Sequence, residues 1–309
     1  MRFAPHFTLH LFAAMVFSAG CGADLEGPPD ARPSMDAGVG DAHQNAPSDG
    51  AVVDGAVSPP MVPGCAGGDG LEEGEHRFSL EGLERRFILR LPGGYDPARS
   101  WPVVLALHAN GNDITYWDRT GGFLDIRRTL TEEAVLVVVE AIDGQWRDYE
   151  MPSETWSDRA EVELRYLDEV ISRVGAGICV DPRALFAMGF SGGGSFAGLL
   201  GCRRADIRAV AVGGAVGYFD PAECVGTPAA WITLGDLEIT NARLAFRDLM
   251  RTRAGCAETS APVAPAPCQA YDDCDEGTPV HFCPHVSGHV WPDIGNDGMW
   301  TFFRGFLDP

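Results

Sequence analysis

The sequence predicts an α/β fold in which helices cover both faces of a mostly parallel sheet. Two apolar runs rich in β-branched residues, at 101–109 and 134–142, have the length of buried strands, and the apolar run at 183–190 predicts another. Two longer segments, 160–174 and 239–255, place apolar residues at helical spacing. Strands that alternate with helices along a chain are typical of a parallel sheet, because each connection must cross back over the sheet.

The remaining elements continue this pattern. Residues 76–92 alternate apolar and polar side chains and predict a hairpin. Apolar runs predict further strands at 207–214, 229–235 and 278–286, and apolar spacing predicts further helices at 195–202 and 298–308.

The N-terminal part differs in composition from the rest. Residues 1–21 predict an export signal with a positive start, an apolar stretch and small residues before Cys21. The SAGC segment that ends at Cys21 resembles a bacterial lipobox, with Ser18 where leucine is usual. We therefore expect export, either as a lipoprotein in the periplasm or on the outer surface, or as a secreted protein. Residues 22–64, rich in Pro, Gly, Ala and Asp, predict a disordered tether, and residues 65–309 predict one folded domain.

The composition limits the partners. The 309 residues carry a net charge of -21 and 45% of them are hydrophobic. Nucleic acid is not expected as a partner, because binding it requires a basic surface. No apolar run reaches the roughly 18 residues of a membrane-spanning helix, so contact with a membrane is expected only through an N-terminal lipid. We expect a monomer.

The cysteine count fits an exported chain. Nine cysteines are present, and assigning Cys21 to lipid leaves eight, which can form four disulfides in an oxidising compartment. Their connectivity stays open at this point.

A serine among glycines predicts the chemistry. Ser191 follows a predicted strand and precedes a predicted helix in the sequence GFSGG, with Gly189 and Gly193 flanking it. In a nucleophile elbow the strand and helix pass so close that these neighbours must be small, and the serine hydroxyl is lifted above the sheet. The G-x-S-x-G pattern in this context predicts Ser191 as a nucleophile.

A nucleophilic serine needs a base and an acid. His289, in SGHVWP after the last predicted strand, is the predicted base. Asp236 and Glu238 both follow the strand 229–235, and either could be the acid, with a slight preference for Glu238. The chain order serine, acid, histidine is that of an α/β-hydrolase.

The segment LHANG after the strand 101–109 predicts an oxyanion-binding loop. The backbone N–H groups of Ala109 and Gly192 are the expected donors, with His108 as a structural residue that orients the loop. Trp117 and Trp291 are candidate walls for an aromatic or sugar-bearing substrate.

Together these motifs resemble the polyhydroxybutyrate depolymerase and feruloyl esterase group of secreted α/β-hydrolases (carbohydrate esterase family 1, LpqC-like). The resemblance runs from Cys65 to the C-terminus. It is carried by YDPARSWPVVLALHANG, by CVDPRALFAMGFSGGGSFAGLLGC, and by the C-terminal segments AGC, YDDC and SGHVWP.

The resemblance implies a serine esterase that needs no cofactor or metal and acts on an ester of a polysaccharide or polyester. It implies Ser191 as nucleophile, His289 as general base and Asp236 or Glu238 as the orienting acid. Two positions depart from the family pattern. Ala109 replaces a glycine, and LGDLE replaces the usual segment before the acid.

Two alternatives remain at this point. One is an inactive surface-binding protein, although the serine and the histidine are both retained. The other is a metal-binding module, for which the chain offers the ligand types zinc accepts in Cys268, Cys274, His281, Cys283 and His285.

Overall fold

The computed structural model describes residue 65 and residues 70–130, 132–147 and 156–307. The predicted export signal, the lipid-modified Cys21 and the tether 22–64 lie outside the described residues. Contacts divide the chain into Met1–Val53 and Asp54–Pro309, and all described residues belong to the second unit.

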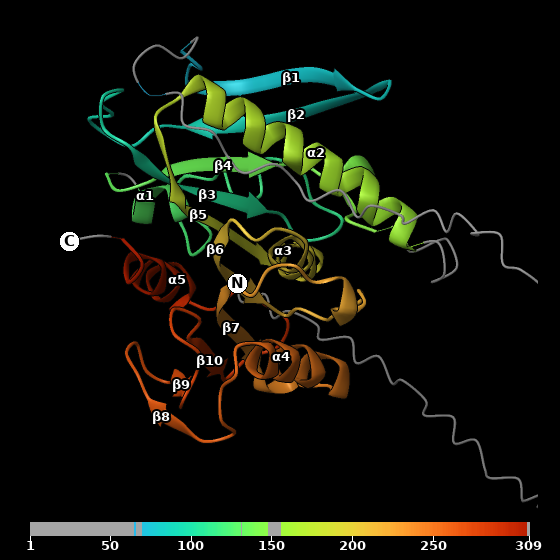
Figure 1. The fold of residues 1–309 in the computed structure, drawn as a ribbon, viewed down its shortest axis with the longest axis vertical. Coiled ribbons are helices and arrows are strands. Elements are labelled where there is room, and N and C mark those ends of the chain that lie inside the picture. The colour runs from blue at the N-terminus through green and yellow to red at the C-terminus, as the bar shows by residue number, and fades with distance from the viewer. Residues whose placement is uncertain (1–64, 66–69, 131, 148–155, 308–309) are drawn as a thin grey trace, which may run out of the picture. The chain divides into compact units, whose positions relative to one another are not determined.

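A ten-stranded sheet forms the centre of this unit (Figure 1). Its spatial order is β1 (Gly74–Leu80), β2 (Leu83–Arg90), β4 (Val135–Val139), β3 (Trp101–Leu107), β5 (Val180–Phe190), β6 (Ile207–Gly213), β7 (Ala229–Gly235), β10 (Val280–His285), β9 (Gln269–Tyr271) and β8 (Ser260–Pro262). The six central strands pair in parallel, in the spatial order β4, β3, β5, β6, β7 and β10. At the two edges, β1, β2, β8 and β9 pair antiparallel.

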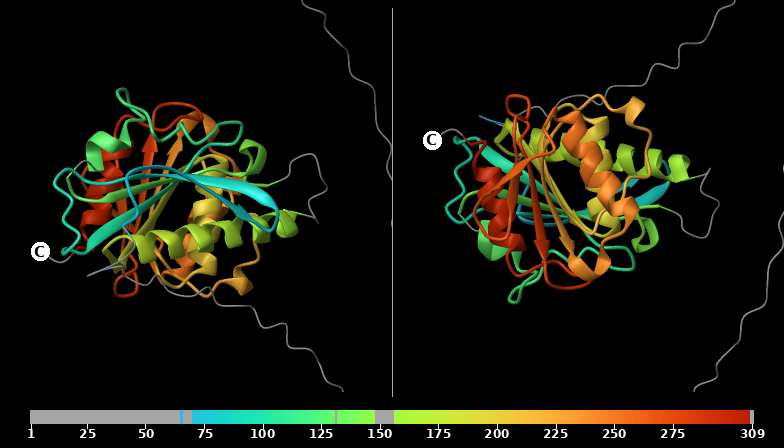
Figure 2. Two further views of the ribbon diagram at one scale, coloured as in Figure 1. Left: turned by 90° about the horizontal axis from the view of Figure 1, so that it is seen from above. Right: turned by 90° about the horizontal axis from the view of Figure 1, so that it is seen from below.

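Helices cover both faces of the sheet (Figures 1 and 2). The first face carries α2 (Trp156–Gly177), α3 (Gly192–Arg203) and α4 (Asn241–Arg253), and the second carries α1 (Ile126–Leu130) and α5 (Gly295–Arg304). Every residue of β3 is buried, and its side chains alternate between the two cores. A strand buried on both faces must be apolar throughout, which explains the continuous runs in the sequence.

The predicted α/β architecture is therefore confirmed, and the differences are local. The hairpin at 76–92 is β1 and β2, and the predicted strands and longer helices are present within a few residues of their expected ends. The short helix α1 and the edge strands β8 and β9 were not predicted. Each has five residues or fewer, too few to establish a period.

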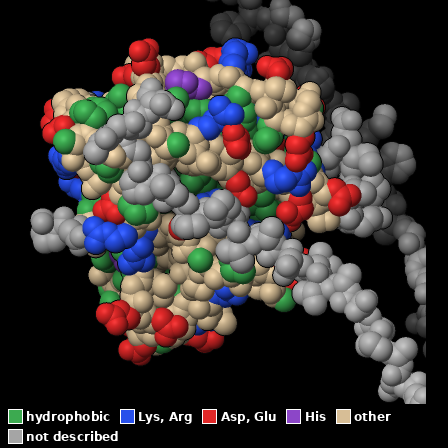
Figure 3. All heavy atoms as spheres, turned by 45° about the horizontal axis from the view of Figure 1, so that its top comes forward, with side chains coloured by type: hydrophobic (Ala, Val, Ile, Leu, Met, Phe, Trp, Pro, Cys, Tyr) green, Lys and Arg blue, Asp and Glu red, His purple; other side chains and the backbone are tan. Residues whose placement is uncertain are grey.

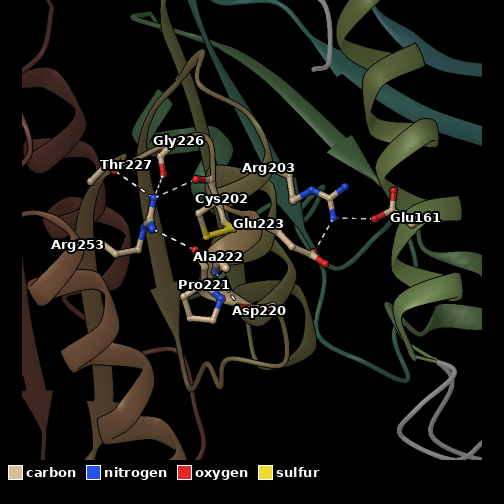
Figure 4. The surroundings of a disulfide bond; sticks show 11 residues. Glu161, Cys202, Arg203, Asp220, Pro221, Ala222, Glu223, Gly226, Thr227 and Arg253 are labelled. Atoms are coloured by element: carbon tan, nitrogen blue, oxygen red, sulfur yellow. Dashed lines mark hydrogen bonds and ion pairs between the residues drawn. A yellow bond between two sulfur atoms is a disulfide. The ribbon is translucent and has the colours of Figure 1, made fainter. Parts of the chain in front are cut away.

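Four disulfides join the eight cysteines outside the N-terminal region, as expected. The pairs are Cys65–Cys179, Cys202–Cys224, Cys256–Cys274 and Cys268–Cys283. Cys202 lies at the end of α3, and Cys224 follows the short 3₁₀ helix Pro221–Glu223 (Figure 4). Arg253 of α4 donates hydrogen bonds to the carbonyls of Pro221 and Gly226 in the same loop.

The surface is charged, but the charges are mixed. On the face shown in Figure 3, Arg side chains lie among Asp and Glu side chains. Ion pairs such as Arg86 with Glu140 and Arg90 with Asp118 join such neighbours. None of the helices in the described part of the chain is long and apolar enough to cross a membrane.

Removing the Cys202–Cys224 bond, by changing both residues to alanine, is expected to lower the free energy of unfolding by about 3 kcal/mol. The bond closes a loop with a sequence separation of 22 residues, and its loss restores the entropy of that loop in the unfolded chain. Urea unfolding measures the effect. Removal of Cys256–Cys274, with a similar separation of 18, should cost a similar amount, so a large inequality would contradict the loop-entropy explanation.

Candidate active site

Ser191 occupies the sharp turn between β5 and α3. Its backbone has φ 56° and ψ -118°, a conformation that a residue with a side chain rarely adopts. The Ser191 N–H donates to the carbonyl of Gly213 at 2.7 Å, and its carbonyl accepts from Ser195 N–H at 2.9 Å. Neighbouring strand and helix thus hold the strained residue on both sides.

The flanking glycines are required by close packing. A Cβ on Gly189 would lie 2.4 Å from the backbone of Gly193. A Cβ on Gly193 would lie 2.2 Å from the carbonyl oxygen of Leu107 at the end of β3. Only glycine allows α3 to start this close to both strands. Ser191 is therefore flanked by residues without side chains.

The structure brings Ser191, His289 and Glu238 together at the carboxyl ends of the parallel strands. His289 Nε2 lies 2.8 Å from Ser191 Oγ, although the two residues are 98 positions apart in the chain. His289 Nδ1 makes a hydrogen bond with Glu238 Oε2. The imidazole ring also packs against Phe190, with ring centroids 4.6 Å apart.

Glu238 is held as a buried carboxylate. It ends the 3₁₀ helix Asp236–Glu238 that follows β7, and its Oε1 accepts from Gly235 N–H at 3.0 Å. Burial alone raises the pKa of the Glu238 carboxyl. The hydrogen bonds from His289 and Gly235, together with the charge of Arg243, outweigh burial, so the pKa lies below its ordinary value.

Asp236 lies elsewhere. The turn of Asp236–Glu238 directs the third residue back toward Gly235 N–H and leaves the first one exposed. Among the described residues, Asp236 forms no hydrogen bond with His289. It lines a groove of about 530 Å³ together with His285 and Val290.

The loop after β3 lies beside the start of α3. A Cβ on Gly192 would meet the side chain of Asn110 at 2.2 Å, so Asn110 lies directly against the residue after the serine. Asn110 Oδ1 accepts from Trp146 N–H at 3.1 Å. The candidate oxyanion donors, Ala109 and Gly192, are both buried in this region.

His108 has both ring nitrogens engaged within this loop. Its Nε2 accepts from Ala141 N–H at 3.1 Å, which leaves Nδ1–H to donate to the carbonyl of Ala109 at 2.9 Å. Burial lowers the pKa of His108, so the ring stays neutral and orients the loop.

The two tryptophans proposed as pocket walls belong to the core. Trp117 is fully buried and donates its indole N–H to the carbonyl of Leu107. Trp291 is 2% exposed and donates to Asn296. The two rings pack edge to face on each other with centroids 5.3 Å apart, and Trp291 also lines the groove that contains Asp236.

The cysteines considered for a metal-binding module are oxidised. Cys268 and Cys283 form one disulfide, and Cys274 is joined to Cys256. Their sulfur atoms are therefore not thiolate ligands, which is the form that zinc binds.

The side chains of Asn110 and Arg243 contact residues of the candidate site, Gly192 and Glu238. No sequence motif predicted either contact. Arg243 Nε lies 3.3 Å from Glu238 Oε2. The sequence could have indicated Arg243 as a neighbour of the site, because it lies in the first turn of the predicted helix that directly follows Asp236 and Glu238.

Comparison with known proteins finds feruloyl esterases among the relatives of the chain. No protein-family model matches the chain. The probable feruloyl esterase C of Aspergillus terreus is 24% identical over 246 residues, which cover 72% of this chain and 84% of the relative. The feruloyl esterase C of Emericella nidulans is 23% identical over 265 residues, which cover 78% and 90% of the two chains.

A solved structure shows the same fold. The CE1 ferulic acid esterase of Anaeromyces mucronatus, in the absence of substrate, superposes with a TM-score of 0.56 at 15% identity and covers 78% of this chain and 94% of its own. The chain is a carboxylic ester hydrolase with the α/β-hydrolase fold, and its relatives are feruloyl esterases.

Proposed function

We propose that this protein hydrolyses feruloyl esters of plant polysaccharide, with Ser191 as nucleophile, His289 as general base and Glu238 as the acid that orients it. The observation that supports this proposal is the continuous chain of hydrogen bonds from Ser191 Oγ through His289 to Glu238. The feruloyl ester is chosen because two curated relatives carry that activity in their names.

The first half of the reaction forms an acyl-enzyme. Because His289 Nδ1–H donates to Glu238, the unprotonated Nε2 takes the proton of Ser191 Oγ as this oxygen attacks the ester carbonyl. The carbonyl oxygen becomes an oxyanion, held by the N–H groups of Ala109 and Gly192. Loss of one such donor typically costs about 2.7–4 kcal/mol of transition-state stabilisation. The carbon–oxygen bond to the alcohol then breaks, and Nε2–H protonates the departing oxygen.

The second half repeats these steps with water. Nε2 takes a proton from water, the resulting hydroxide attacks the acyl carbon, and Nε2–H returns a proton to Ser191 Oγ. The carboxylic acid leaves, and the enzyme is restored. Every proton in this scheme moves between Ser191, His289 and the substrate or water, so the scheme includes no proton transfer to a cofactor.

Export is the second part of the proposal. Four disulfides are typical of a protein that folds in an oxidising compartment. Cleavage before Cys21, which removes residues 1–20, and attachment of lipid at Cys21 would retain the enzyme at a membrane surface, near polymeric substrate.

Ser191→Ala is expected to lower kcat/KM for methyl ferulate by about 10⁴-fold or more, because the attacking oxygen is lost. The same pair of proteins should be compared on p-nitrophenyl acetate, acetylated xylan and short polyhydroxybutyrate, which rank the acyl groups. Ser172→Ala, an exposed serine of α2, is the matched control and should retain full activity. Equal turnover by Ser191→Ala and wild type would exclude this mechanism.

Glu238→Gln is expected to lower kcat on methyl ferulate by about 10³–10⁴-fold, since an amide neither carries the charge nor holds the imidazole in the correct tautomer. Asp236→Asn removes an exposed carboxylate only two residues away and should change kcat less than about twofold. Steady-state kinetics of the two variants decide between the acids. A large loss in Asp236→Asn with little loss in Glu238→Gln would reverse the assignment.

A further inference from the structure

Arg243 places a positive charge against the buried end of the hydrogen-bond chain. Its Nε lies 3.3 Å from Glu238 Oε2, and its Nη1 donates to the Glu238 carbonyl at 3.2 Å. Its Nη2 lies 3.3 Å from His289 Nδ1. The side chain is only 21% exposed, so water screens this charge weakly.

The guanidinium joins three loops that follow different strands. Nε also points at the carbonyl of Gly214, at 3.3 Å, in the loop after β6. Gly214 has φ +61°, and a Cβ there would lie 2.5 Å from His289 Cε1, so this loop passes directly beside the imidazole. Arg243 itself is anchored in the first turn of α4, where its N–H donates to the capping hydroxyl of Thr240.

The contact with the imidazole is electrostatic. In the tautomer that pairs with an ionised Glu238, the single Nδ1–H of His289 donates to the carboxylate, which can only accept. Arg243 therefore makes no hydrogen bond to Nδ1 in this tautomer, but it lies close enough to oppose a second positive charge on the ring. The same charge favours the ionised form of Glu238 and, through its two contacts with that residue, fixes the direction of the carboxylate.

We propose that Arg243 is a positioning residue that holds Glu238 against His289 and extends the activity of the pair to lower pH. The proposal rests on the function proposed above, because it assigns the pair to the reaction. It concerns how the pair binds protons, which can also be measured without a substrate.

The sign of the pH effect follows from the charges around the pair. Arg243 approaches from α4, His285 from the end of β10 and Asp236 from the 3₁₀ helix itself. Burial lowers the pKa of His285, so it is neutral near pH 7, and Asp236 is exposed. The hydrogen bonds from His289 and Gly235 and the charge of Arg243 together lower the pKa of Glu238, and the Arg243 guanidinium, 3.3 Å from both Glu238 Oε2 and His289 Nδ1, repels an added positive charge on the pair. Without Arg243 the pair binds its inactivating proton at higher pH.

The test compares Arg243→Met, Arg243→Lys and a control, Arg247→Met, which removes an arginine of the same helix that pairs with Asp248. In Arg243→Met the acid limb of the kcat/KM profile for methyl ferulate should move up by about one pH unit. Arg243→Lys should restore part of the shift, because lysine keeps the charge without the planar fork. Arg247→Met should follow the wild-type profile.

A second measurement separates this proposal from the proposed function. The low-field proton resonance of His289 Nδ1–H reports the bond to Glu238, and its titration midpoint should rise in Arg243→Met by the same amount as the acid limb. If Ser191→Ala stays active, the proposed function fails while this titration still decides the role of Arg243. An unchanged midpoint overturns the proposal. The proposal is also overturned if Arg243→Met loses activity equally at all pH values and Arg243→Lys does not restore it, since a purely structural role would have that effect.

Discussion

The close approach of α3 to strands β3 and β5 is the constraint on which the site depends. Helix and strands pass within van der Waals distance only because Gly189 and Gly193 have no side chains. This approach forces the single residue between strand and helix into a strained backbone conformation, and that residue is Ser191. The strain persists because β3 and the last seven residues of β5 are buried and densely packed, so they cannot relax around it.

The parallel sheet brings residues that are distant in the chain to the same edge as Ser191. In such a sheet the carboxyl ends of all strands face the same edge, so loops after β5, β7 and β10 meet there. The register between β7 and β10 pairs Gly235 with His285, which sets the loops that carry Glu238 and His289 next to one another. Leu237 N–H donates to the carbonyl of Ser287, and this bond ties the two loops together.

A buried carboxylate and a partly buried guanidinium both lie next to the imidazole of His289. The Glu238 carboxylate is buried and receives hydrogen bonds from His289 and a backbone N–H, so it need not be solvated to stay ionised. The imidazole is partly open, with 39% of its side chain exposed, which is compatible with the proton transfer proposed for it. Arg243 places a positive charge 3.3 Å from the Glu238 carboxylate. Groups from three loops and one helix therefore meet at His289 and Glu238.

Short-range patterns in the chain were sufficient for the fold class, the disulfide count and the candidates Ser191 and His289. Each depends on local chemistry: burial of a strand demands an apolar run, an elbow demands glycines, and export favours paired cysteines. The identity of the acid candidate in contact with His289 was not decidable in this way, because Asp236 and Glu238 are equally acidic and only two residues apart. The direction of one 3₁₀ turn separates them, and that turn is stabilised by a hydrogen bond to Gly235 N–H. Tertiary packing likewise decided that Trp117 and Trp291 are core residues and that Arg243 reaches the imidazole, since burial and contact between segments depend on how elements meet and not on their own spacing.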